Sequence, residues 1–406
     1  MNIKWNIIRV FEYSLILIYI ILLNRDSYYF ILSGVNRDII IFFISFYFIW
    51  RLIFIILKKG KKKLWSKQIF LICSLVILSS MWSPDIVGSL KKAILYIFMP
   101  YAFSLYIVNK YPTKKILNIT FFAGLVISIS SYIVTIMFPE VGIMTQAFKS
   151  MNLWRGVYTH KNLLSAASCF YLIITLYLYF DSKNKLYLIT IFLHIILILL
   201  SGSSTGIIVL ILSIVFTSII IIISKIKNYK IRLGITTLFS FTMLLLIVFF
   251  VKYINLISEI FGKDLTFSGR TYIWAAVLEL IKEHLIFGYG YGGFWINGSF
   301  TLNYVNSNTP WNDIHQQSHN GFLDVVSNVG IVGLMLIILT IITYLFRVIK
   351  MANHHNLKIL SLIFLIFFII YNLQESFLIE QNFFMWMFYT YFYLNTKKLY
   401  NQEVME

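Results

Sequence analysis

The chain has 406 residues, of which 59% are hydrophobic and only 12% are charged. A soluble domain carries about 25% charged residues, so this composition excludes an ordinary soluble domain and indicates a membrane protein. The formal net charge of +18 follows from the distribution of Lys and Arg between loops, described below, and does not indicate a nucleic-acid partner.

Apolar runs recur along the whole chain, and most approach or exceed the roughly 20 residues that a helix needs to cross a bilayer. We therefore predict an all-α polytopic membrane protein, a single transmembrane domain over 1–406 with about twelve helices. The first run is followed by no small-residue cleavage site, so we expect a retained helix rather than a signal peptide. The expected spans are about 7–23, 38–57, 68–82, 90–108 (interrupted by Pro100), 116–138, 163–180, 186–200, 205–223, 233–253, 321–346, 358–373 and 377–394.

The connections between these spans alternate in charge. One set holds most of the Lys and Arg residues of the chain and only three acids, Asp181, Glu403 and Glu406. The opposite set is nearly balanced in charge. Because short cytoplasmic loops carry the excess of Lys and Arg, both chain termini are expected in the cytoplasm.

With this orientation, the two longest connections fall on the outer face. They are 254–320, which contains an amphipathic helix, and 139–162. Loops of such length are usually functional or disordered. Many transporters are built from two related halves. The sequence shows no such internal repeat, which argues against a transporter of that kind. Cys73 and Cys169 lie in apolar runs and indicate buried thiols rather than a disulfide framework.

The first candidate site residue is Arg270, in a predicted helix over 268–285. Ser268 is a suitable N-cap, and apolar residues recur at helical spacing at Ile273, Val277, Leu280, Ile281 and Leu285. A cation in the first turn is disfavoured by the helix dipole, so Arg270 is better explained by an anion bound there. Alternatively, Arg270 reaches towards lipid headgroups and Trp274, one turn on, is an interfacial anchor.

The Gly-rich stretch 287–293, FGYGYGG, follows this helix. It lacks the strand and helix that a dinucleotide-binding loop requires, so we reject a nucleotide site. The glycines predict a tight turn close to the membrane or to a substrate. Tyr289 and Tyr291 offer flat faces that suit either sugars or the bilayer interface.

The stretch 318–324, SHNGFLD, opens the tenth span with His319, Asn320 and Asp324. Asn320 and Asp324 start a polar stripe on an otherwise apolar helix. Ionisable groups at this depth usually face the bundle interior and mark a site; the other interpretation is a helix start still within the headgroup zone. His319 is suited to exchange a proton near neutral pH.

The spacing of two histidines raises the question of a metal site, which the rest of the pattern does not favour. His315 and His319 are four residues apart, with Asp313 as the near carboxylate, but the pattern lacks the Glu of zinc proteases. The first outer loop, 24–30, contains no pair of carboxylates. We therefore expect a mechanism without metal or other cofactor.

The second outer loop contributes Arg155, His160, Lys161 and Asn162 just before the sixth span. Two cations and a His there form a second candidate anion site, with simple solvation of a loop as the alternative. The turn 201–205, SGSST, lies at the same outer side.

Together these residues resemble the O-antigen ligase and Wzy-type polysaccharide polymerase superfamily of bacterial inner membranes. The resemblance rests on Arg270 with Trp274, on the Gly288-x-Gly290-x-Gly292 turn, and on His319-Asn320 followed by Gly330-Ile331-Val332-Gly333. Thr159–Asn162 and Met81–Asp85 are further similar stretches. Many relatives carry a Ser-Arg pair near the turn that is SGSST here, whereas this chain has no Arg between 156 and 231.

The resemblance implies a GT-C-like enzyme with a large periplasmic loop that acts on undecaprenyl-pyrophosphate-linked glycans, with membrane lipids around it. It implies that His319 accepts a proton from the acceptor hydroxyl. Arg270, helped by Arg155 or Lys161, would stabilise the leaving pyrophosphate. The expected reaction is polymerisation of repeat units with inversion; the alternatives are ligation to lipid A core and, from another class, a flippase or transporter. A chain-length regulator and a flippase are the implied partners.

Overall fold

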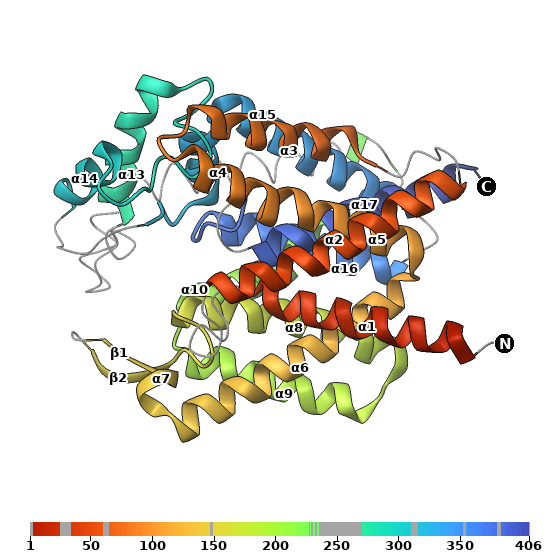
Figure 1. The fold of residues 1–406 in the computed structure, drawn as a ribbon. Coiled ribbons are helices and arrows are strands. Elements are labelled where there is room, and N and C mark those ends of the chain that lie inside the picture. The colour runs from red at the N-terminus through yellow and green to blue at the C-terminus, as the bar shows by residue number, and fades with distance from the viewer. Residues whose placement is uncertain are drawn as a thin grey trace.

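The computed structural model describes residues 3–24, 34–59, 65–146, 149–226, 228, 230–231, 234, 270–309, 316–351, 355–379 and 383–405. These residues are almost entirely helical, as predicted, and most of the helices run side by side in one bundle (Figure 1). Three sequence predictions lie outside the described residues: the span 233–253 apart from residue 234, the N-cap Ser268, and the metal-site candidates Asp313 and His315.

Among the described residues, seven helices are long and apolar enough to cross a membrane. They are Asn36–Leu57, Ile86–Lys110, Thr113–Met137, Lys161–Ser182, Ser204–Ser224, Gly321–Lys350 and His355–Asn372. Two shorter apolar helices, Lys67–Trp82 and Lys185–Leu200, pack among them. The multi-pass membrane architecture is therefore confirmed, whereas the number twelve stays a prediction.

Each expected span except 233–253 overlaps one or two helices of the bundle. In chain order these helices are α1 (Ile3–Leu23), α2 (Gly34–Lys59), α3 (Lys67–Ser79), α4 (Ile86–Lys92), α5 (Met99–Lys110), α6 (Thr113–Met137), α8 (Lys161–Ser182), α9 (Lys185–Leu200), α10 (Ser204–Ser224), α15 (Gly321–Lys350), α16 (His355–Asn372) and α17 (Phe383–Met405).

The interruption expected at Pro100 is a change of helix type rather than a break. A π-helical turn over Ala93–Phe98 joins α4 to α5, and Pro100 stands at the start of α5. A proline has no N–H to donate, so it fits best where a helix begins. The whole of Ile86–Lys110 therefore remains one continuous span.

One boundary prediction is wrong in a way that matters for the site. The last two spans were expected at 358–373 and 377–394, but α16 ends at Asn372 and α17 begins at Phe383. Phe377, Leu378 and Ile379 look like the start of a span, yet they are buried at 0–2% exposure in the connection between the helices. This connection brings the residues around 375 into the end of the bundle.

The smaller elements gather at the end of the bundle opposite to both chain termini (Figure 1). The loop 139–162 forms α7 (Pro139–Gly142) and an antiparallel hairpin of β1 (Ile143–Gln146) and β2 (Lys149–Trp154), which the all-α prediction did not include. The described part of 254–320 forms α13 (Arg270–Ile281), the 3-10 turn Lys282–His284 and α14 (Phe300–Ser307).

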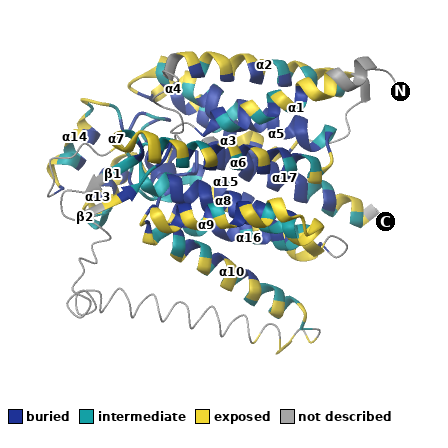
Figure 2. Cartoon of the chain, turned by 90° about the horizontal axis from the view of Figure 1, so that it is seen from below, coloured by how far each residue is buried: buried dark blue, intermediate teal, exposed yellow. Residues whose placement is uncertain are grey.

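Two apolar cores support this arrangement. The large one fills the bundle around α17, whose Trp386, Phe388 and Tyr389 are 0% exposed, and the buried residues line the inward faces of the surrounding helices (Figure 2). A separate small core joins α13 and α14 through residues such as Ile273, Val277 and Phe294. Leu285, expected on the apolar face of α13, is 49% exposed, because the helix ends before it.

The Gly-rich turn is fixed to the bundle by close backbone contacts. Gly290 has φ +87°, and a Cβ there would lie 2.7 Å from the backbone N of Ser83. Further along, α15 is broken at Gly330, which has φ +71°. The carbonyls of Leu285 and Ile286 accept hydrogen bonds from the N–H groups of Ile331 (2.8 Å) and Val332 (3.4 Å). Residues 285–286 thus accept hydrogen bonds from N–H groups that have no partner within the broken helix. Within a membrane, such N–H groups need a partner from the protein.

Candidate functional site

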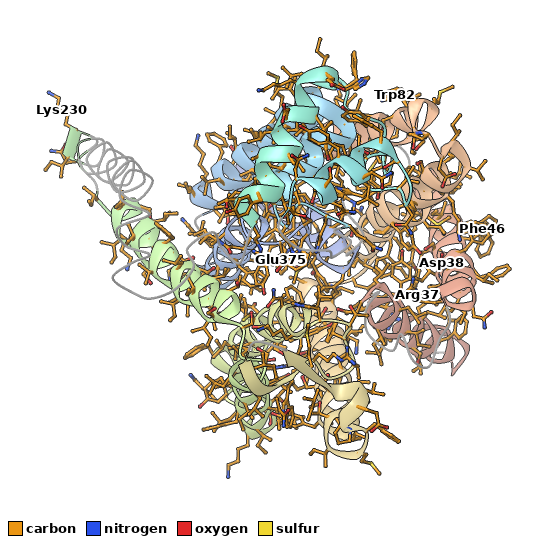
Figure 3. The ribbon with its side chains drawn as sticks, turned by 90° about the vertical axis from the view of Figure 1, so that its left-hand side faces the viewer. Arg37, Asp38, Phe46, Trp82, Lys230 and Glu375 are labelled. Atoms are coloured by element: carbon orange, nitrogen blue, oxygen red, sulfur yellow. The ribbon has the colours of Figure 1, made fainter. Side chains whose placement is uncertain are left out.

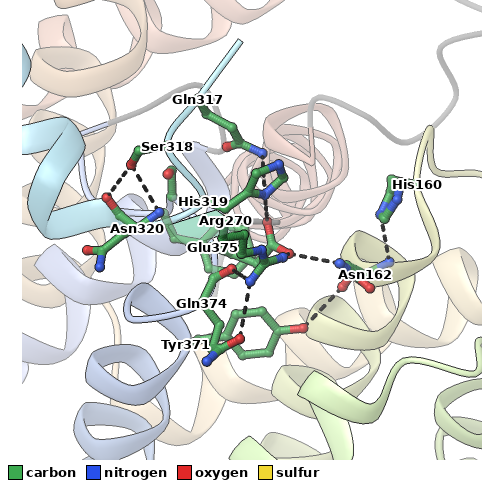
Figure 4. A network of polar contacts seen from close by, with 12 residues as sticks. His160, Asn162, Arg270, Gln317, Ser318, His319, Asn320, Tyr371, Gln374 and Glu375 are labelled. Carbon is green, nitrogen blue, oxygen red and sulfur yellow. Dashed lines mark hydrogen bonds and ion pairs between the residues drawn. The ribbon is translucent and has the colours of Figure 1, made fainter. Parts of the chain in front are cut away.

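Four separate chain segments converge on one buried carboxylate, that of Glu375. They are the first residue of α13, the segment just before α15, the start of α8 and the α16–α17 connection that carries Glu375 itself. Seen from the end of the bundle that carries α13 and α14, Glu375 lies near the centre of the molecule (Figure 3). The polar network around it is shown in Figure 4.

Glu375 is 3% exposed and accepts from three side chains. Its Oε1 accepts from Arg270 Nη2 at 2.8 Å and from Asn162 Nδ2 at 2.8 Å. Its Oε2 lies 3.0 Å from His319 Nδ1. A buried carboxylate requires such compensation, because an unpaired charge away from water is strongly disfavoured.

These partners decide the protonation state of the carboxyl. Burial alone raises the pKa of Glu375, but the hydrogen bond from His319 and the positive charge of Arg270 outweigh burial and bring the pKa down to about 2. Glu375 is therefore a carboxylate at every physiological pH. A permanent negative charge next to an imidazole is the arrangement that orients a catalytic His in many hydrolases.

His319 has the geometry of an oriented base. A carboxylate only accepts, so Nδ1 must carry the hydrogen that lies between it and Glu375. In the neutral imidazole, Nε2 is then the atom with a lone pair for a proton. The His319 side chain is 28% exposed, in contrast to 4% for the side chain of Glu375, so the base lies at the accessible edge of the network.

The backbone of His319 is strained, with φ +53°. A left-handed conformation costs a residue other than glycine about 1–3 kcal/mol and persists only where neighbouring contacts impose it. Both neighbours are fixed here. The Ser318 carbonyl accepts from Trp274 Nε1 at 2.9 Å, and Asn320 caps α15, its Oδ1 accepting from the N–H groups of Phe322 (3.1 Å) and Leu323 (3.3 Å).

Arg270 joins α13 to the α16–α17 connection. Besides the ion pair with Glu375, its Nη1 donates to the backbone carbonyl of Gln374 and to Gln374 Oε1, the latter at 3.1 Å. The sequence prediction placed an anion at Arg270, and in the structure the first anion there is the chain's own Glu375. Arg270 has further N–H donors, since a guanidinium carries five.

The start of α8 completes the network through Asn162. Its Nδ2 donates to Glu375, its Oδ1 accepts from Ser203 Oγ at 3.0 Å, and its backbone carbonyl accepts from Tyr371 Oη at 3.1 Å. His160 Nδ1 accepts from the Asn162 N–H at 3.2 Å and so caps the helix. Burial lowers the pKa of His160, which favours the neutral ring.

The predicted residues of the 139–162 loop separate into two groups. His160 lies within the network (Figure 4), and Lys161 is the first residue of α8 beside it. Arg155 lies elsewhere: its Nε donates to the Val141 carbonyl at 2.7 Å and ties β2 to α7.

Several predicted binding residues are engaged with protein. Tyr289 Oη donates to the Leu280 carbonyl at 2.8 Å. Tyr291 is 4% exposed and its N–H donates to Ser79 Oγ at 3.1 Å. Asp324 is 0% exposed. These contacts favour roles in holding the loops, and direct contact of these three residues with a substrate stays a prediction.

Glu375 is the residue that sequence reasoning missed. In the sequence, Glu375 lies between the two last apolar runs. The apolar residues Phe377, Leu378 and Ile379 resemble the start of a membrane span, so the connection from 373 to 382 is not recognisable as such. A signal was present: Arg270 and His319 need a counter-charge, and the last outer connection is short and carries an acid. Ser203 of the SGSST turn also gains a role, because its hydroxyl orients Asn162.

Comparison with known proteins finds two similarities, each over part of the chain. Residues 189–338 match a family model described as O-antigen ligase, a range that includes Arg270 and His319 but neither Asn162 nor Glu375. A stretch of 84 residues is 31% identical to the exopolysaccharide production protein ExoQ of Rhizobium meliloti (strain 1021), and it spans 19% of this chain and 18% of that protein.

Proposed function

We propose that this chain, which belongs to the O-antigen ligase and Wzy-type polymerase superfamily, is a surface-polysaccharide polymerase. It would join oligosaccharide repeat units that are carried on undecaprenyl pyrophosphate. The observation that carries the proposal is the pairing of His319 with Glu375 next to Arg270, at the end of a membrane bundle. A proton acceptor and a cation are the two groups that glycosyl transfer from a pyrophosphate needs.

The proton transfer starts at the acceptor sugar. As its hydroxyl oxygen attacks the anomeric carbon of the donor, the hydroxyl proton passes to Nε2 of His319. The imidazole becomes positively charged, and the Glu375 carboxylate at Nδ1 stabilises that charge. Attack opposite to the leaving group inverts the configuration at the anomeric carbon.

The leaving group is the undecaprenyl pyrophosphate. The bond between the anomeric carbon and the phosphate oxygen breaks, and the electron pair stays on the pyrophosphate. Arg270, with Lys161 at the start of α8, supplies positive charge where negative charge develops. Because His319 and Arg270 account for proton transfer and charge stabilisation, we expect neither a metal nor another cofactor.

On this proposal, the reaction takes place at the periplasmic face of a bacterial inner membrane, and both termini lie in the cytoplasm. The excess of Lys and Arg in the opposite connections supports this orientation. Lipid-linked substrates would reach the site laterally from the bilayer, and a flippase and a chain-length regulator would act before and with the polymerase.

A ligase is the second candidate, favoured by the description of the matching family model. A ligase transfers the glycan to lipid A core instead of to another lipid-linked repeat. The chemistry at His319 and Arg270 is the same in both cases, and the acceptor alone differs.

Surface polysaccharide from a deletion strain distinguishes the two on one gel. Lipid A core capped with a single repeat is expected if a polymerase is lost. Bare core with accumulation of lipid-linked polymer would identify a ligase and contradict the polymerase. An unchanged polysaccharide pattern would contradict both.

A further inference from the structure

Asp324 joins the two loops that carry the base and its partner carboxylate. It lies in the first turn of α15 and is 0% exposed. Ser318, directly before His319, donates its backbone N–H to both carboxylate oxygens, at 3.1 and 3.2 Å. Ser376, directly after Glu375, donates its hydroxyl to Oδ2. One buried side chain thus holds the neighbours of both His319 and Glu375.

We propose that Asp324 is a positioning residue that sets the contact between His319 and Glu375 from behind. The inference rests on the proposed function. It assigns Asp324 a role in the reaction without contact with the substrate. This role differs from the predicted contact of Asp324 with the glycan.

The chemistry of the donors explains why a carboxylate stands here. Asp324 accepts from the Ser318 N–H, from Ser376 Oγ and from Trp295 Nε1, the last at 3.0 Å. Both oxygens of Asp324 therefore face donors: Oδ1 faces the Ser318 N–H and Trp295 Nε1, and Oδ2 faces the Ser318 N–H and Ser376 Oγ. An amide of the same shape has one acceptor oxygen, and its NH₂ group would face donors.

The strained backbone of His319 gives Asp324 a second effect. His319 has φ +53°, and Ser318 before it is held at its N–H by Asp324 and at its carbonyl by Trp274. Releasing the N–H lets this segment relax to an ordinary backbone conformation. His319 would then turn away from Glu375 while the helices stay in place.

The test compares Asp324→Asn and Ser376→Ala with wild-type protein in a chain-extension assay with purified enzyme. We expect kcat to fall about 10- to 100-fold in Asp324→Asn, as expected for a displacement of about 1 Å, and KM to change little. Asp181→Asn is the matched control, since Asp181 pairs with Lys114 on the surface. Its kcat should equal the wild-type value.

A double-mutant cycle separates positioning from a general loss of stability. In the Glu375→Gln background, Asp324→Asn should lower kcat less than threefold, because the contact between His319 and the Glu375 carboxylate that Asp324 maintains is already lost. Full additivity of the two effects, or a wild-type kcat in Asp324→Asn, would overturn the proposal. If Asp324→Asn does not reach the membrane, Ser376→Ala decides in the same cycle: a wild-type kcat or additivity with Glu375→Gln overturns the proposal.

His319→Ala in the same assay tests the proposed function separately. Loss of activity in His319→Ala together with a wild-type kcat in Asp324→Asn overturns only the role of Asp324. Retention of activity in His319→Ala overturns the proposed function and with it the proposal.

Discussion

His319 and Glu375 are 56 residues apart in the sequence, and their Nδ1 and Oε2 atoms are 3.0 Å apart in the fold. The pair forms where the loop before α15 meets the connection after α16. Neither residue could act alone as described: the imidazole needs the carboxylate to fix its tautomer, and the carboxylate needs cations to stay charged when buried.

The first prediction concerns the charge of Glu375. Glu375→Gln keeps the shape but removes the charge that stabilises the His319 imidazolium. We expect kcat in chain extension to fall by about 10²–10⁴-fold, the contribution typical of general base catalysis, with a small change in KM. Glu140→Gln, at an exposed position of α7, is the control and should behave as wild type. A kcat within twofold of wild type in Glu375→Gln would remove Glu375 from the mechanism.

The second prediction concerns acid stability. The pKa of Glu375 is lowered from 4.5 to about 2 in the folded protein. A lowered pKa contributes stability above the unfolded value, and that contribution is lost as the pH falls from 4.5 to about 2. In that window, the thermal unfolding midpoint in detergent should fall more steeply for wild type than for Glu375→Gln. Parallel curves would show that the carboxylate is not stabilised by its partners.

The third prediction concerns Asn162, whose amide is the neutral donor to Glu375. Asn162→Ala removes a hydrogen bond to a charged group, a loss of about 1.5–3 kcal/mol. We expect the free energy of unfolding and kcat both to fall. Asn303→Ala, on the exposed face of α14, is the control. Equal values of kcat and of the unfolding free energy in Asn162→Ala and Asn303→Ala would mean that α8 does not belong to the site.

The fourth prediction concerns the break in α15. Gly330 has φ +71°, and a Cβ there would overlap the Ile286 carbonyl. Gly298 has φ +80° with open space around the Cβ position. Gly298→Ala should therefore lose only the cost of the left-handed backbone, about 1–3 kcal/mol, and Gly330→Ala clearly more. Thermal unfolding of the two variants measures the difference; an equal loss would contradict the close approach of the loop.

The bundle was predictable because its signal is strong and local. Long apolar runs and the charge of their connections follow from the cost of placing polar groups in lipid. The β1–β2 hairpin was not predicted, since a two-stranded ribbon in a loop has a weak pattern. The start of α17 was misplaced because Phe377, Leu378 and Ile379 are as apolar as a span, although they pack in a connection.

The site was predictable in part. Arg270, His319 and His160 were noticed because a charge or an imidazole is conspicuous beside apolar sequence, and they do lie in one network. Their mutual arrangement was not predictable, since it depends on Glu375, which lies beyond the next helix. Arg155 shows the opposite case: a cation in the expected loop that serves the local fold instead.

The proposed polymerase activity depends most directly on His319 as the proton acceptor. The decisive measurement is extension of purified undecaprenyl-pyrophosphate-linked repeats by His319→Ala protein, with His355→Ala as the matched control, since His355 lies at the exposed start of α16. We predict that His319→Ala still inserts in the membrane but forms no polymer, whereas His355→Ala forms chains of normal length. Polymer formation by His319→Ala at the wild-type rate would contradict the account.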